Sequence, residues 1–113
     1  MASLLNTYEN ILISTLREYA EMFNQQRDGM EAKVLIDKEN KHYQLLNYGF
    51  SRGVHECYII FHFEIKNNKI WVQENRTDIL IANELCEKGV AKSHIVLGLQ
   101  EPELRAFSGY AVA

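Results

Sequence analysis

The sequence predicts an α+β fold: an N-terminal helix packed on an antiparallel sheet of about four strands, then a second helix and short C-terminal helical turns. Three observations lead to this class. The first segment carries apolar residues at spacings of three and four, the middle of the chain holds four strand-like runs joined by short polar turns, and a second amphipathic segment ends at Gly89. With 113 residues the chain has the length of one domain, so residues 1–113 are expected to form a single domain.

The first helix is expected from Leu4 to Phe23. Ser3 suits its N-cap, because a serine oxygen can accept a hydrogen bond from the first turn. A polar segment from Gln25 to Gly29 is expected to form the following loop. The apolar stripe of the helix consists of Leu5, Tyr8, Leu12, Leu16, Tyr19 and Phe23.

Four strands are expected in the middle of the chain. Because the connections between them are short, the strands should be antiparallel neighbours in a hairpin meander. A two-residue turn at Asn67 and Asn68 would pair Ile65 with Ile70 and, further along, His62 with Gln73. The expected strands are Ala32 to Asp37, His42 to Phe50, Val54 to Lys66 and Lys69 to Glu74.

This register divides the last two strands into two faces. One is apolar enough for a core, and we expect the first helix to cover it. The other is too aromatic for plain solvent and predicts a surface for a protein partner or for self-association into a dimer or higher oligomer. The core face carries Cys57, Ile59, Phe61, Phe63, Ile65, Ile70 and Val72; the second face carries Tyr58, Ile60, His62, Glu64, Trp71 and Gln73.

The C-terminal third begins with a second helix, expected from Asp78 to Lys88, with Thr77 or Asp78 as its cap. A helical turn should follow with Pro102 at its start. The tail from Gly109 has no charged side chain and should dock, either on its own sheet or on a partner. The candidate partner-binding residues are therefore Trp71, Tyr58, Ile60, Gln73, Tyr110 and Val112.

The composition restricts the class of protein. A net charge of −3 and a pI near 5.8 argue against an autonomous nucleic-acid binder, which needs a basic excess. Two cysteines suit a reducing compartment. No apolar run exceeds five residues and no secretory signal is evident, so a cytoplasmic location is expected.

No catalytic or metal-binding constellation is evident, so no enzyme activity, metal or cofactor is expected. His62 and Glu64 share a face, but no third ligand can be identified. The alternative is a metal-dependent nuclease, because Glu64 and Lys66 match half of an acid-x-lysine motif, with Asp37 or Glu56 as the other acid.

A second alternative is a weak DNA-binding module. Basic residues gather at the hairpin ends and strands, and aromatic side chains could stack on bases. Interleaved glutamates would cancel much of their field. The basic residues are Lys33, Lys38, Lys41, Arg52, Lys66 and Lys69.

Segments along nearly the whole chain resemble one known family, the XisI-like proteins, also called fdxN element excision controlling factors. Phe50, Ala91 and Leu99 depart from the family pattern, where Trp, Pro and an aromatic residue are usual; these are packing or turn positions. The matching segments are residues 42–46, 53–57, 65–66, 69–73, 81–85, Gly89, residues 95–98, Pro102 with Arg105, and residues 111–113.

The resemblance implies an accessory role in the excision of a DNA element during heterocyst differentiation in cyanobacteria. It also implies two partners, a site-specific recombinase and a companion factor of endonuclease-like type. It supplies no catalytic residues. The expected function is therefore regulatory and non-catalytic, exerted through protein contacts.

Overall fold

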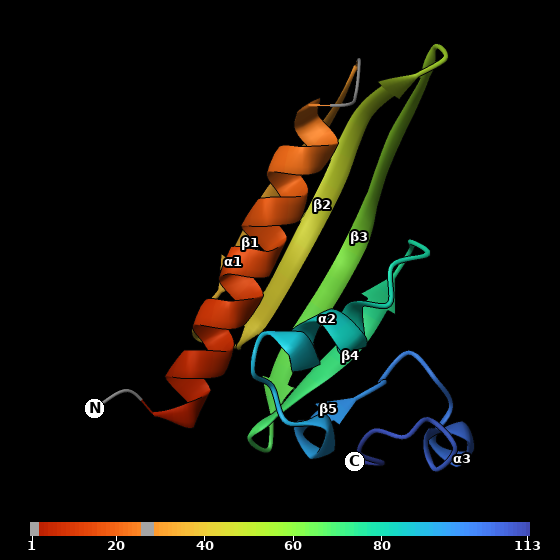
Figure 1. Cartoon of the computed structure of the whole chain (residues 1–113). Helices are drawn as coiled ribbons and strands as arrows, with labels where there is room; N and C mark the ends of the chain where they lie inside the picture. Colours follow the sequence, from red (N-terminus) through yellow and green to blue (C-terminus); the bar gives the residue numbers. More distant parts are fainter. Residues whose placement is uncertain (1–2, 26–28) are drawn as a thin grey trace.

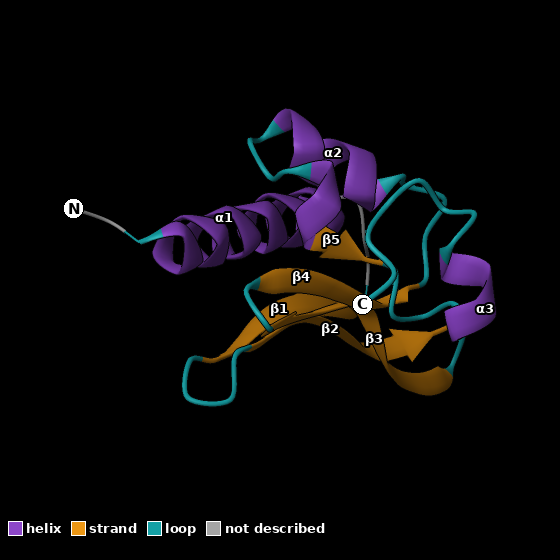
Figure 2. Cartoon of the chain, turned by 90° about the horizontal axis from the view of Figure 1, so that it is seen from below, coloured by secondary structure: helices purple, strands orange, loops and turns teal. Residues whose placement is uncertain are grey.

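Two helices lie on one face of a five-stranded sheet in the computed structural model, which describes residues 3–25 and 29–113 (Figures 1 and 2). The order of the strands follows the chain, and all neighbours are antiparallel except β4 and β5. The α+β class and the helix-on-sheet packing are thus confirmed, with a fifth, parallel strand added at one edge. The elements are α1 (Leu4–Gln25), β1 (Met30–Asp37), β2 (His42–Ser51), β3 (Val54–Lys66), β4 (Lys69–Asn75), α2 (Ile81–Glu87), β5 (Ile95–Val96) and α3 (Pro102–Arg105).

The first helix forms as its apolar stripe predicts. The Oγ of Ser3 accepts a hydrogen bond from the Asn6 N–H at 3.1 Å, which confirms the N-cap. Tyr8, Leu12 and Leu16 are buried against the sheet. The helix continues two residues beyond the predicted end, and most of the loop expected after it, residues 26–28, lies outside the described residues.

A β-bulge changes the faces of β3. Leu45 pairs with Phe61, whereas Leu46 pairs with Ile59, so Ile60 is an extra residue without a partner in β2. Residues before the bulge therefore point to the face opposite the one that strict alternation predicts. Ile60 is 3% exposed in the core, which makes its predicted place on the outer face wrong; Cys57, predicted for the core, is exposed.

The β3–β4 hairpin confirms most of the predicted register. Ile65 pairs with Ile70, and the next two pairs also agree. A second bulge then makes Gln73 the extra residue, so His62 pairs with Glu74 and the predicted pair of His62 with Gln73 is wrong. Phe61, Phe63 and Ile65 lie in the core as predicted, because they follow the first bulge.

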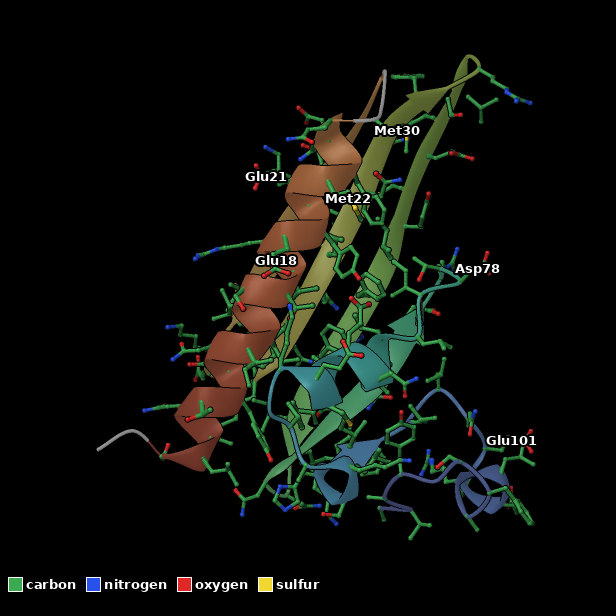
Figure 3. All side chains as sticks on the ribbon, in the orientation of Figure 1. Glu18, Glu21, Met22, Met30, Asp78 and Glu101 are labelled. Carbon is green, nitrogen blue, oxygen red and sulfur yellow. The ribbon has the colours of Figure 1, made fainter. Side chains whose placement is uncertain are left out.

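The second helix begins at Ile81, three residues later than predicted. Figure 3 places Asp78 in the connection between β4 and α2, and the Thr77 Oγ1 accepts a 3.0 Å bond from the Ile79 N–H within this connection. Thr77 thus stabilises a turn and does not cap the helix. The helix ends at Glu87, one residue before the predicted end, with Lys88 as its C-cap. Gly89 follows the cap as predicted, and its φ of +110° is the left-handed conformation that glycine adopts most easily.

The uncharged tail docks on the protein's own sheet, which decides between the two expected docking places. The Ala111 N–H donates a 2.8 Å hydrogen bond to the Ile95 carbonyl, and Ala111 forms a parallel bridge with Val96. Pro102 starts α3 as predicted. Within the described residues, no helix combines the length and hydrophobicity needed to cross a bilayer.

Candidate functional site

Trp71 lies on the sheet face opposite the helices, as predicted, but it is covered by its own chain. Its exposed fraction is only 8%. The backbone of Gly98 lies so close that a Cβ there would be 3.1 Å from the indole Cε3. The prediction of Trp71 as an exposed anchor for a partner is therefore wrong for the protomer. The connection after β5 covers the indole, where a partner was expected to bind.

Arg105 holds this covering segment in place. Its guanidinium donates to the carbonyls of Leu97, Gly98 and Gln100 at 3.1–3.3 Å. The same guanidinium lies 5.2 Å from the centre of the indole of Trp71, within the range of a cation–π contact. One arginine thus joins the C-terminal segment to the outer face of β4.

Three other predicted partner-binding residues form hydrogen bonds within the chain. Tyr58 is half-buried and its hydroxyl accepts a 2.8 Å bond from the Asn47 amide. The Gln73 amide donates to Glu64 at 3.1 Å. Tyr110 is half-buried and its hydroxyl bonds the Asn83 side chain; burial raises the pKa of Tyr110. Val112 is 55% exposed and remains available for an outside contact.

Two histidines meet on the outer face. The Nδ1 of His42 lies 2.8 Å from the Nε2 of His62, and the other nitrogen of His42 lies 3.7 Å from Glu64. Burial, and then the positive charge that His42 can carry, lowers the pKa of His62. Since Glu64 faces the far nitrogen of His42, the three side chains do not converge on one point, and no group of three such ligands in the described ranges could hold a metal ion.

The residues of the nuclease alternative do not converge either. Asp37 pairs with His42, which in turn pairs with Glu64, so Asp37 and Glu64 are two strands apart, about 10 Å. Glu64 is bonded to Gln73, and the ammonium of Lys66 lies 4.1 Å from the centre of the Trp71 ring. Glu56 lies toward the opposite end of β3.

Sequence reasoning missed the surface that the bulge creates. A shallow hollow of about 390 Å³ lies where β3 continues beyond the end of β4, and no sequence pattern pointed to it. Figure 2 shows that the helices lie on the opposite side of the sheet from the outer face of β1 to β3. The hollow is lined by Leu46, Cys57, Tyr58, Ile59, Glu74 and Arg76.

The basic residues divide between the two ends of the sheet. Lys38 and Lys41 belong to the β1–β2 turn, and Lys66 and Lys69 flank the β3–β4 turn at the same end, because alternate turns of a meander share one end. Arg52 lies in the β2–β3 turn at the other end. Lys33 lies within β1.

Comparison with protein families assigns nearly the whole chain. The family model described as XisI protein matches residues 1–112. The chain belongs to the XisI family. A solved XisI-like protein from Anabaena variabilis is 37% identical to it, with a TM-score of 0.89 over 96% of this chain and 99% of that one.

A second solved structure supports the same placement of this XisI family member. It is named fdxN element excision controlling factor XisI, also from Anabaena variabilis, and is 26% identical with a TM-score of 0.84. The match covers 98% of this chain and 100% of that chain. No curated protein matches the chain. The resemblance drawn from the sequence is thus confirmed at the level of the family.

Proposed function

We propose that this protein is a non-catalytic accessory factor that controls the excision of a DNA element in a cyanobacterium by binding protein partners. The observation that carries the proposal is the full-length match, in fold and in sequence, to a protein named as an excision controlling factor. The companion endonuclease-like factor and the site-specific recombinase are the partners proposed, and the protein is proposed to act in the cytoplasm.

The outer face of β2 and β3 is the surface proposed for these partners. The hollow next to the end of β4 offers the apolar side chains of Leu46 and Ile59, flanked by the charged Glu74 and Arg76. An apolar centre with a polar rim is typical of specific protein interfaces. Tyr58 borders this hollow, but the bulge turns its side chain toward the helix face, so its predicted place on the outer face is wrong. Ile60 and Trp71 do not take part.

An excision assay with purified components tests the role. The substrate is a plasmid that carries the element between its recombination sites, incubated with recombinase and companion factor. Excision should rise when this protein is added and should fall with an Ile59→Arg variant, which places a charge in the hollow. A Val54→Arg variant, altered at an exposed apolar residue near the β2–β3 turn, is the matched control. Equal excision with and without the protein would refute the accessory role.

The same components separate the nuclease alternative from the accessory role. The purified protein alone, given Mg²⁺ or Mn²⁺ and supercoiled plasmid, should leave the plasmid intact. Cleavage that the Glu64→Gln variant abolishes would show instead that the protein is a metal-dependent nuclease.

Direct DNA contact is a second candidate, favoured by the four lysines at one end of the sheet, Lys38, Lys41, Lys66 and Lys69. Binding to duplex DNA through phosphates must weaken steeply as salt increases. A gel shift at low salt that disappears on changing Lys38 and Lys41 to Gln would support this contact. No shift at any salt concentration would exclude it.

A further inference from the structure

Strand β1 is one edge of the sheet, with β2 on one side only (Figure 1). Two observations establish which of its backbone groups point away from β2. Gly29 accepts a 2.9 Å hydrogen bond from the Phe50 N–H, and residues of an antiparallel strand bond their neighbour alternately. Odd-numbered residues of this segment therefore bond to β2, and the N–H and C=O groups of Ala32, Val34 and Ile36 point outward.

Asn24 occupies the first part of this edge. Its Oδ1 accepts a 2.8 Å bond from the Ala32 N–H, and its Nδ2 donates to the Ala32 carbonyl at 3.0 Å. The amide thus takes both outward groups of Ala32, as a neighbouring strand would. Among the described residues no side chain does the same for Val34 and Ile36. The open edge therefore begins after Ala32, and unpaired edges of this kind readily accept another strand.

We propose that a second copy of this chain adds its β1 to this edge, antiparallel, about a two-fold axis at Leu35. In this register Val34 faces Ile36 of the second copy, and the reverse. Because the N–H and C=O groups of both residues point outward, each such pair exchanges both of its hydrogen bonds. The sheet then continues through both copies, with each α1 on the same side.

Of the registers centred on Val34, Leu35 and Ile36, the one centred on Leu35 makes the side chains of β1 complementary to themselves. Lys33 lies opposite Asp37 of the second copy, and Asp37 opposite Lys33, so each charge meets its opposite. Leu35, which is 44% exposed, meets its own copy at the axis. A two-fold axis at Val34 would need the Ala32 N–H and C=O groups for hydrogen bonds to the second copy, and Asn24 already bonds both. An axis at Ile36 would place the apolar Leu35 opposite the charged Asp37.

A disulfide experiment tests the register. Residues at position 35 of the two copies form a pair without hydrogen bonds, with Cα atoms about 4.5 Å apart, which a disulfide can bridge. In a Cys57→Ser background, which removes the exposed native thiol, a Leu35→Cys variant should form a covalent dimer on mild oxidation. A Lys33→Cys variant should not, because its two copies would be about 13 Å apart along the strand.

Sedimentation velocity tests the edge without cross-linking. A Leu35→Lys change sets two like charges at the axis, and Val34→Pro removes an outward N–H while leaving the bonds to β2 intact. Each should raise the dissociation constant of the dimer at least about tenfold, with unchanged circular dichroism, whereas Val54→Lys should not. A wild type that stays monomeric at its highest soluble concentration, or a dimer that both variants leave unchanged, would overturn the proposal. Since no recombinase or DNA is present, either result is independent of the role in excision.

Discussion

The amide of Asn47 donates a 2.8 Å hydrogen bond to the hydroxyl of Tyr58 on the neighbouring strand. The two residues form a cross-strand pair close to the β2–β3 bulge, on the side that precedes Ile60 in β3, and Asn47 is completely buried. A polar residue is therefore held in the core by an aromatic residue that strict alternation would have placed on the outer face. The bond depends on the bulge, because the bulge turns Tyr58 toward the helices.

Loss of this hydroxyl should destabilise the fold. A Tyr58→Phe change leaves the buried Asn47 amide without its acceptor, which costs about 1–3 kcal/mol. The double change Asn47→Leu with Tyr58→Phe removes both polar groups and should recover much of that loss. Urea unfolding of the three proteins gives the values. A Tyr48→Phe control, whose hydroxyl bonds Glu31 at the exposed surface, should stay within about 0.5 kcal/mol of wild type.

Position 98 should not tolerate even the methyl side chain of alanine without a loss of stability. A Cβ there would lie 2.6 Å from the Gln73 Oε1 and 3.1 Å from the indole of Trp71, so Gly98→Ala should lower the free energy of unfolding by about 1–3 kcal/mol. The emission of Trp71, the chain's one tryptophan, should shift to the red as the segment lifts. A double variant with Gln73→Ala removes the nearer contact and should restore part of the stability. An unchanged spectrum and midpoint would contradict this account of the contact.

Arg105 should contribute more to the stability of the fold than an exposed arginine does. Its bonds to three carbonyls and its contact with the Trp71 ring predict that Arg105→Ala costs about 1–2 kcal/mol and makes Trp71 accessible to iodide quenching. Arg17, exposed on α1, is the control and should change neither quantity. Equal quenching in both variants would show that the segment docks without Arg105.

Local patterns predicted the order and the class of the elements but not the faces of β3. The stripe of α1, the turn at Asn67 and Asn68, and the glycine that ends α2 are signals carried by a few neighbouring residues, and all of them are confirmed. A bulge inserts one residue and exchanges every side chain beyond it, and no residue type marks it in the sequence. Strict alternation therefore assigns Ile60 and Cys57 to the wrong faces.

The candidate site was harder to predict because its cover comes from distant residues. Trp71 was rightly placed on the outer face from the local register. Its burial depends on Gly98 and Arg105, which approach it only after α2 and β5 have returned the chain to the sheet. The hydrogen bond from Asn24 to β1 is equally non-local. Periodicity describes what an element can bury, whereas topology decides what covers it.

The histidine pair on the outer face should make stability depend on pH. Burial lowers the pKa of His62 below its ordinary value of 6.5, His42 lowers it further, and Glu64 and Glu74 act in the opposite direction. The folded state therefore binds this proton less readily than the unfolded state does. The stability linked to His62 is present above pH 6.5 and is lost as the pH falls from there toward the lowered pKa.

Urea unfolding between about pH 7.5 and about pH 5.5 brackets the ordinary histidine pKa and checks this sign. The wild type should lose more stability over this range than a His62→Gln variant, because the variant has no proton to exclude. A His55→Gln variant, altered at an exposed histidine of β3, should follow the wild type. If the His62→Gln variant loses as much stability as the wild type, the acid sensitivity comes from other groups and the role given to this pair is wrong.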